Sequence, residues 1–236
     1  MPIIAVDNEK RIKQFHQLPF KIYKNDPNWV PHLEQDVEKV FDEKKNKFFR
    51  HGEANRWLLE KDGKIVGRIA AFINHKGNKK SKEPMGGMGY FECINDEKLA
   101  FELFDHCKNW LENKGMQCMD GPINFGEKDK FWGLITGNFD YPPYYNQNYN
   151  PEYYVPFFEN YGFKTFYEQF IYHRNTSDEL IPLLKEKSQR IRKDNRFTFD
   201  TIKKNNLEKY AEDFRTVYNR ACVNHEVLAG MEKSEA

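Results

Sequence analysis

One hairpin constrains the fold of this chain more than any other stretch. The run "RWLLEKDGKIVGRIAAFIN" holds two strand-like segments, Arg56 to Glu60 and Lys64 to Asn74, that meet at Asp62-Gly63. An Asp-Gly pair tolerates the positive backbone angles of a primed turn, whose twist matches that of two paired strands. The sequence therefore predicts an antiparallel strand pair here, around which the other elements must be arranged.

Strand and helix signals alternate on both sides of this hairpin, as in an α/β or α+β protein. The strand, helix and strand that follow it favour parallel pairing of those two strands through a right-handed crossover. Asp96 is the expected N-cap of that helix, and Lys114-Gly115 its end. In chain order, the predicted elements are a strand at Pro2 to Val6, a helix through Ile12 and Leu18, a helix at Leu33 to Phe41, the hairpin, a strand at Met88 to Asn95, the helix from Asp96 and a strand in "MQCMDGPINF".

The stretch "NPEYYVPFFENYGFKTF" predicts a short aromatic helix followed by a strand. Asn150 is its expected N-cap with Pro151 in the first turn, and Gly162 lies where a left-handed C-cap belongs. Pro156 would either kink this helix or make it begin one turn later. The strand, Lys164 to His173, would then be the last of this region.

The C-terminal part repeats the opening order of elements. Its sequence predicts a helix at Asp178 to Arg192, a half-buried strand in "RFTFDTIKK" and a periodic helix from Leu207 to Ala221. We therefore expect one domain at residues 1–175 and a C-terminal strand-helix extension at residues 176–236. This extension is either the start of a second domain or an appendage that packs on the first.

Charge and cysteine usage exclude several classes of function. With 37 basic and 36 acidic side chains the net charge is +1, so no field attracts nucleic acid or an acidic membrane. The lysine-rich stretch Lys76 to Lys82 has no interleaved aromatic residues and is expected to be a solvated loop or an expanded turn. The four cysteines form no C-x-x-C pair, and no metal is expected. The sequence shows no signal peptide and no apolar run of membrane-spanning length, which favours a cytoplasmic protein.

The order of these elements resembles the GNAT-type acyl-CoA N-acyltransferase fold, a mixed central sheet flanked by helices. "EKDGKIVGRIAAFIN" looks like the family's second and third strands, "WLENKGMQCMDGPIN" like the end of its central helix and its fifth strand, and "FFENYGFKTF" like its closing signature. The likeness spans about Ile3 to His173. More narrowly, "LPFKIYKNDPNWVP", "GYFECIND" and "NYNPEYY" resemble a bacterial group of GNAT-like proteins of uncharacterised activity, in which a second such domain follows.

The resemblance implies a site for acetyl-CoA or another acyl-CoA. In the family the fourth and fifth strands splay apart, free backbone groups bond the pantetheine arm, and amides at the next helix N-terminus hold the pyrophosphate. This turn reads "INDEKLAF" here: it lacks the family's glycines, and Asp96 and Glu97 place negative charges where phosphates would lie. The cofactor-binding positions that the resemblance implies are Phe91, Cys93, Asn95, Lys98, Leu99 and Asn124.

The implied catalytic positions also depart from the family pattern. Its thiolate-protonating tyrosine lies four residues before the Gly of Gly-Phe, and that position is Phe158, which has no proton to give. Tyr153 and Tyr154, one turn earlier, can substitute only if the helix is rotated or shifted. Glu92, on the fourth strand, is the candidate general base, although its side chain can equally face solvent.

A long aromatic connection, Gly126 to Tyr149, is the candidate acceptor pocket. Loops of this length are often lids or binding walls, and its aromatics can equally shield the sheet. The candidate pocket residues are Trp132, Tyr141, Tyr144, Tyr145 and Tyr149.

Two main functions stay open on the sequence. The first is an acyl-CoA-dependent N-acyltransferase that transfers an acetyl group to a small-molecule amine or a peptide. The alternative is a catalytically degenerate GNAT-like scaffold that binds no CoA and supports a second GNAT-like domain, as the altered turn and Phe158 favour. A third is an aromatic pocket that binds a peptide or sugar without chemistry. Whether the chain also forms a homodimer is left open.

Overall fold

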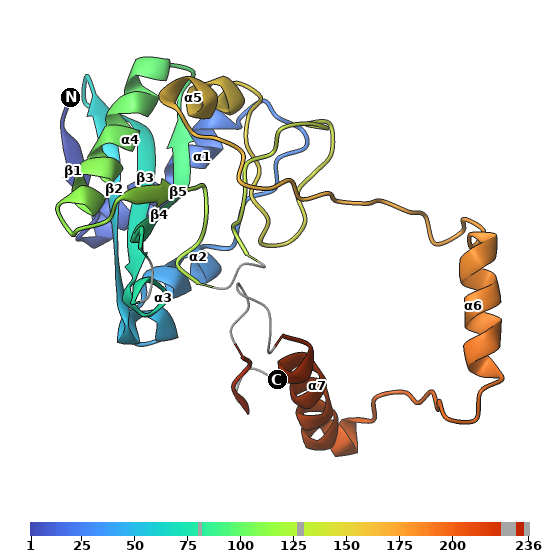
Figure 1. Cartoon of the computed structure of the whole chain (residues 1–236). Helices are drawn as coiled ribbons and strands as arrows, with labels where there is room; N and C mark the ends of the chain where they lie inside the picture. Colours follow the sequence, from blue (N-terminus) through green and yellow to red (C-terminus); the bar gives the residue numbers. More distant parts are fainter. Residues whose placement is uncertain (80–81, 127–129, 223–229, 234–236) are drawn as a thin grey trace. The chain divides into compact units, whose positions relative to one another are not determined.

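The computed structural model describes residues 1–79, 82–126, 130–222 and 230–233 (Figure 1). Its internal contacts divide the chain into two compact units, Met1–Thr165 and Phe166–Ala236, and each is considered by itself. The division falls ten residues before the expected domain boundary, and the second domain stays a prediction.

The first unit is built on a five-stranded mixed sheet in the order β1-β2-β3-β4-β5. The pairs β1–β2, β2–β3 and β3–β4 are antiparallel, and β5 runs parallel to β4. Asp62 and Gly63 have φ angles of 51° and 72°, which confirms the predicted hairpin turn. The strands are β1 (Ile3–Ala5), β2 (Gly52–Lys61), β3 (Lys64–Asn74), β4 (Met85–Cys93) and β5 (Cys118–Asp120).

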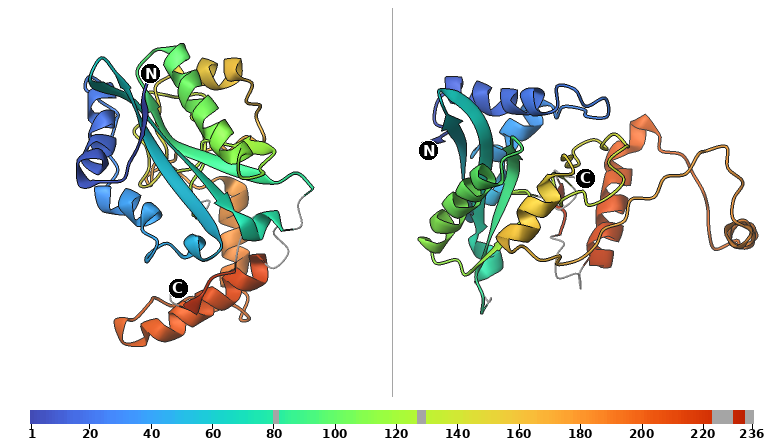
Figure 2. Two further views of the ribbon diagram at one scale, coloured as in Figure 1. Left: turned by 90° about the vertical axis from the view of Figure 1, so that its left-hand side faces the viewer. Right: turned by 90° about the horizontal axis from the view of Figure 1, so that it is seen from above.

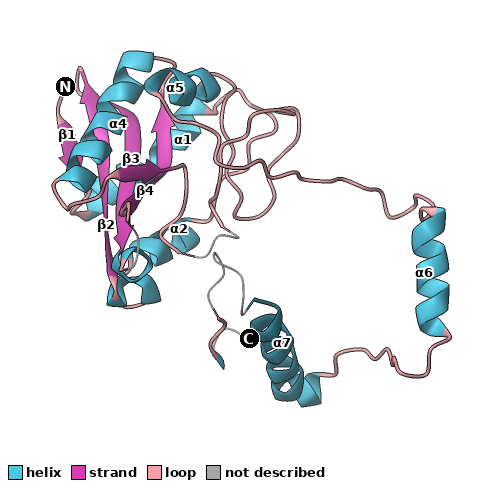
Figure 3. Ribbon diagram, in the orientation of Figure 1, coloured by secondary structure: helices cyan, strands magenta, loops and turns pink. Residues whose placement is uncertain are grey.

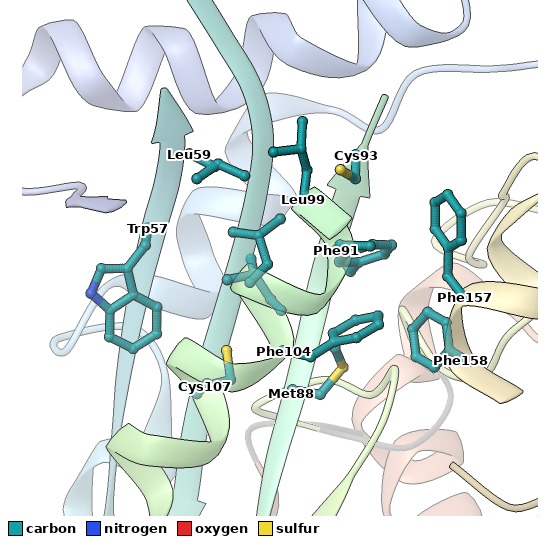
Figure 4. Packing of buried hydrophobic residues seen from close by; sticks show 14 of the residues in the cluster. Trp57, Leu59, Met88, Phe91, Cys93, Leu99, Phe104, Cys107, Phe157 and Phe158 are labelled. Atoms are coloured by element: carbon teal, nitrogen blue, oxygen red, sulfur yellow. The ribbon is translucent and has the colours of Figure 1, made fainter. Parts of the chain in front are cut away.

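Helices cover both faces of this sheet, and Figure 2 shows α1 and α4 on opposite sides of it. Helices α1 (Glu9–Ile22) and α2 (Glu34–Phe41) pack on one face, where Phe15 and Leu18 meet Leu58 and Phe72. Helices α4 (Glu97–Glu112) and α5 (Tyr154–Tyr161) pack on the other. Figure 4 shows this second cluster, in which Phe91, Phe104 and Phe158 lie together.

The ends of α4 follow the sequence signals. The Asp96 side chain accepts a hydrogen bond from the Leu99 amide at 3.4 Å, as the predicted N-cap should. Beyond the helix, Gly115 has a φ of 82°, which places it in the left-handed region expected after a helix end. Two short helices, η1 (Lys47–Arg50) and α3 (His75–Asn78), complete the unit. The expected lysine-rich loop is therefore helical at its start, and its residues 80–81 lie outside the described part.

Helix α5 begins at Tyr154, so the prediction of Asn150 as its N-cap was wrong. Pro156 lies in the first turn, where its missing N–H has no helical acceptor to lose, and the helix begins later instead of kinking. Asn150 donates to the carbonyls of Ile135 and Pro151 instead. Gly162 ends the helix with a φ of 109°, which confirms the C-cap.

Two predicted strands did not form. No regular strand forms at Lys164 to His173 or in the run "RFTFDTIKK". An alternation of apolar and polar residues yields a strand only where a neighbouring strand completes its backbone hydrogen bonds. The second unit contains α6 (Pro182–Arg192), η2 (Lys204–Asn206) and α7 (Leu207–Cys222), drawn as helices in Figure 3. Pro182 opens α6, so this helix begins four residues after its predicted start at Asp178. Over the described ranges of both units, no helix is long and apolar enough to cross a bilayer.

Candidate functional site

The ladder between β4 and β5 stops after three residue pairs, of which Gly87 with Asp120 is the last. A bulge in β4 follows, where Tyr90 has a φ of 53° and the register to β3 shifts. Gly89 permits the next segment to approach, because a Cβ there would lie 1.9 Å from the carbonyl oxygen of Ile123. The chain after β5 thus stays in contact with β4 as far as Gly89, where the Ile123 amide also donates to the Met88 carbonyl at 2.8 Å. The predicted splay is confined to the end of β4 beyond Gly89, which has no ladder partner in β5.

Glu92 lies beside this opening with its side chain turned inward. It is 7% exposed, so the alternative in which it faces solvent is wrong. The hydroxyls of Tyr23 and Tyr154 each donate to its Oε2 at 2.9 Å, and Nη2 of Arg68 lies 3.4 Å from its Oε1. Three elements of the fold thus converge on one buried carboxyl group.

The two candidate tyrosines of the α5 region both contact Cys93 at the end of β4. The Tyr154 hydroxyl accepts from the Cys93 amide at 2.7 Å, and the Tyr153 hydroxyl donates to the Cys93 carbonyl at 3.0 Å. No β5 residue pairs with this stretch of β4. The structure therefore brings Glu92, Tyr153 and Tyr154 together. The two phenol groups bond the Cys93 backbone, which has no partner in β5.

Burial dominates the electrostatics of this cluster. It raises the pKa of Glu92, although Arg68 and the two tyrosine hydrogen bonds favour the ionised form. Burial and the nearby Glu92 also raise the pKa of Tyr153 and hold that of Tyr154 well above its ordinary value. Burial raises the pKa of Cys93 to about 12, so its thiol stays protonated at neutral pH. The arrangement can exchange protons through a carboxyl group and neutral phenols, and it supplies no thiolate nucleophile.

The cofactor-binding positions are not gathered into one surface. Phe91 and Leu99 are buried in the cluster beneath α4. Asn95 and Lys98 are exposed near the start of α4. Asn124 is buried, where its Oδ1 accepts a hydrogen bond from the Tyr90 hydroxyl at 3.0 Å. Phe158 is part of the core, as Figure 4 shows.

The aromatic connection also divides between cavity and surface, and its residues 127–129 lie outside the described part. Tyr149 lines a cavity of about 40 Å³, and its hydroxyl donates to Asp26 at 2.8 Å. Tyr141, Tyr144 and Tyr145 are 63%, 52% and 71% exposed, and Trp132 is half-buried. These five residues therefore form no single pocket wall.

Sequence reasoning missed three residues of the site, namely Tyr23, His32 and Arg68. Arg68 carried a signal, since it is the one charged residue inside the apolar run "IVGRIAAFI". Tyr23 follows α1 and stacks on Trp29 with ring centroids 5.0 Å apart, which no periodicity indicates. His32 lines the cavity, and burial together with Arg68 lowers its pKa to about 4. Across the described residues, no group of three or more potential ligands could hold a metal ion.

Two curated bacterial proteins resemble the chain in sequence, while no family model matches it. A bacterial ceramide synthase from Caulobacter vibrioides (strain NA1000 / CB15N) is 26% identical over 191 residues, which cover 80% of this chain and 50% of the relative. Protein YghO from Escherichia coli (strain K12) is 26% identical over 216 residues, with 90% and 54% covered. The chain thus spans about half the length of these relatives.

The solved structures that align with the chain include acetyltransferases. One is AAC(6')-Iy with a CoA bisubstrate analog, at 14% identity and a TM-score of 0.42, covering 74% of this chain and 97% of that one. Another is a putative acetyltransferase from Agrobacterium tumefaciens str. C58, at 12% identity and a TM-score of 0.44, covering 74% and 100%. At such identity the likeness says nothing about the residues of the site. By its strand order, its parallel β4–β5 pair and its helices on both faces, Met1–Thr165 has a GNAT-like α/β fold.

Proposed function

We propose that this chain carries the site of an N-acyltransferase, which moves an acyl group from acetyl-CoA or another acyl-CoA to an amine. The observation that carries the proposal is Glu92, a buried carboxyl group of raised pKa beside the opening between β4 and β5. A general base works best when its pKa lies near the working pH, and burial moves a carboxyl pKa in that direction.

The reaction needs one proton to be removed and one to be supplied. The amine nitrogen bonds to the thioester carbonyl carbon, and Glu92 takes the proton that the nitrogen loses. As the carbon–sulfur bond breaks, the Tyr154 hydroxyl gives a proton to the departing thiolate and is reprotonated by Glu92, to which it is hydrogen-bonded at 2.9 Å. An amide and a free thiol result. In this proposed mechanism Tyr154 supplies the proton that Phe158 cannot give.

The name of one relative supports the same class of reaction. Ceramide is an amide of a long-chain amine, so a protein named a bacterial ceramide synthase forms an N-acyl bond. Because this chain covers 50% of that relative, a long-chain amine as the acceptor here belongs to the proposal.

A second function is favoured by the groups around Cys93 and α4. The hydroxyls of Tyr153 and Tyr154 occupy the Cys93 backbone, so a pantetheine arm could bond there only after they move. Asp96 and Glu97 stand at the start of α4, where a pyrophosphate would need positive charge. The alternative is a GNAT-like module that binds no CoA and supports a second domain.

Thermal unfolding with acetyl-CoA or palmitoyl-CoA separates the two functions. Ligand at a hundredfold excess over Kd stabilises the folded state by about 2.7 kcal/mol, which should raise the melting temperature by several degrees. Lys98→Glu, at the start of α4, should weaken this response, whereas Lys108→Glu near the other end of the same helix should not. A melting temperature that is unchanged by millimolar ligand would reject the enzyme and favour the module.

Turnover tests the base directly. With long-chain amine and acyl-CoA, Glu92→Gln should lower kcat by roughly 10²- to 10⁴-fold, because an amide cannot take the proton. Tyr161→Phe is the control, since the Tyr161 hydroxyl lies at the far end of α5 from Tyr154 and donates to Asp105 of α4. Equal rates in wild type and Glu92→Gln would remove Glu92 from the mechanism.

A further inference from the structure

The cavity beside Glu92 contains a second functional group that proton transfer does not use. Arg68, Glu92 and His32 line it together with Asn148 and Tyr149, all within the first unit. A water-sized group needs roughly 10–15 Å³ in the same measure of volume. The observed volume of about 40 Å³ therefore accommodates about three such groups, the size of a hydroxymethyl or carboxylate substituent.

Arg68 is buried with its hydrogen-bonding capacity only partly used. Its side chain is 6% exposed, and Nη1 donates to the Phe15 carbonyl at 2.7 Å. Nη2 reaches Glu92 at the long distance of 3.4 Å, and Nε has no partner. A buried guanidinium normally has its donors satisfied. Nε is enclosed by protein, so the weak 3.4 Å contact of Nη2, on a side chain that lines the cavity, is the one that leaves room for an acceptor atom from a ligand.

The charge balance of the cavity points to the same missing group. Glu92 is the carboxylate that faces Arg68, and His32 adds no charge at neutral pH because its pKa is about 4. When Glu92 takes a proton from the substrate amine, Arg68 loses its compensating charge while it remains buried. An oxygen acceptor on the substrate would then interact with Arg68 during the step in which Glu92 is neutral.

The spacing of the two side chains limits where that oxygen can lie. The Arg68 and Glu92 side chains are 3.4 Å apart, so one substrate that reaches both must carry its amine and its oxygen close together. Amine and oxygen groups on neighbouring carbons, or one carbon further apart, meet this requirement. An amine at the end of a plain alkyl chain offers Arg68 no acceptor atom.

We propose that the cavity is a recognition site for an oxygen substituent beside the acceptor amine, which is bound by Arg68 while Glu92 faces the amine. The acceptor class is then a vicinal amino alcohol or an α-amino acid, which share this pair of groups. The inference rests on the proposed N-acyltransferase function and adds the class of acceptor to it.

Three amines of equal chain length test the site in the wild-type chain with acyl-CoA: decylamine, 2-aminodecan-1-ol and 2-aminodecanoic acid. We expect kcat/KM for at least one oxygen-bearing amine to exceed that for decylamine by about 10- to 100-fold, the range for a hydrogen bond to a charged group. The two oxygen-bearing arms distinguish a hydroxyl from a carboxylate. Equal kcat/KM for all three would overturn the inference and leave the N-acyltransferase proposal standing.

Three variants test whether the preference for an oxygen-bearing amine depends on the cavity residues. Arg68→Met should bring the ratio of kcat/KM values to about one. Asn148→Leu replaces a polar side chain of the cavity wall with an apolar one of the same branching, without removing a charge, and also removes the hydrogen bond to the Gly133 carbonyl; it should reduce the ratio as well. Arg11→Met is the control, because Arg11 lies on α1 and bonds Ala5 and Asp7 away from the cavity. A preference that survives in both cavity variants would overturn the inference, and Asn148→Leu decides it if Arg68→Met fails to fold.

Calorimetric titration of the three amines without any acyl donor separates this inference from the proposed function. If wild type acylates none of them, the N-acyltransferase proposal fails. Tighter binding of an oxygen-bearing amine to wild type than to Arg68→Met or Asn148→Leu would still support the cavity site. Equal binding of all three amines to wild type would overturn it.

Discussion

The two units of this chain use the same local signals and reach different degrees of burial. In Met1–Thr165, α1, α2, α4 and α5 each place apolar side chains in one of two buried clusters. In the second unit none of the described residues is buried, and Phe214 and Val217 of α7 are 57% and 68% exposed. Isolated helices of this length are marginal in water without tertiary packing. Periodicity therefore predicts where a helix forms, and a complementary surface determines how stable it is.

The largest effect should come from truncating one aromatic residue in each unit. Phe104→Ala removes a fully buried side chain of α4 and should lower the free energy of unfolding by about 3–5 kcal/mol. Phe214→Ala in α7 should change it by less than about 0.5 kcal/mol, because that side chain is 57% exposed. Urea unfolding measures both. A comparable loss in Phe214→Ala would show that the second unit buries this residue in solution.

A smaller effect is expected from breaking one ion pair in each unit. Glu92→Ala leaves Arg68 as an uncompensated buried charge and should cost about 3 kcal/mol in urea unfolding. Glu212→Ala breaks the pair with Arg215 on α7, whose side chains are 45% and 32% exposed, and should cost at most about 0.5 kcal/mol. If Glu92→Ala were as mild as Glu212→Ala, the cluster around Glu92 would be more hydrated than its burial indicates.

Replacing a glycine with alanine in each unit should produce a smaller difference in stability between the two variants. Gly162→Ala puts a side chain at a φ of 109° and should destabilise the protein by roughly 1–2 kcal/mol, although the added Cβ meets no atom within 4 Å. Gly230→Ala, in the second unit, meets Asn219 at an ordinary 3.4 Å and should be close to neutral. Melting temperatures of the two variants test this, and equal values would mean that the α5 C-cap adjusts.

The smallest effect should be a dependence of stability on acid pH. Partial burial opposes ionisation of Glu38, but hydrogen bonds from Arg56 and His16 lower its pKa from 4.5 to about 2. Because the folded-state pKa lies below the unfolded one, the stabilisation is complete above about pH 4.5 and is lost as the pH falls towards 2. Melting temperatures between pH 5 and pH 2 should fall less steeply in Glu38→Gln than in wild type. Glu212→Gln, in the exposed pair of α7, is the control, and a parallel slope in Glu38→Gln would contradict the prediction.

Sequence reasoning predicted most of the first unit but only part of its site. The sheet with its splayed β4 and β5 and the helices on it were expected. Glu92, Tyr153 and Tyr154 were predicted from the family resemblance. Tyr23 and Arg68 match no position of that pattern, and they meet Glu92 only through contacts between residues 69 and 24 positions apart. The strand predicted at Lys164 to His173 failed for a related reason, since a strand needs a partner that its own sequence does not specify.

What the sequence determined by itself was local. The turn at Asp62-Gly63, the Asp96 cap of α4 and the Gly162 cap of α5 each depend on backbone angles and hydrogen bonds within a few residues. Only the tertiary structure decided that Glu92 turns inward and meets Tyr23, Arg68 and Tyr154. The physical reason is that the free energy of a buried polar group depends on partners supplied by distant segments, and these are defined only when the whole unit has folded.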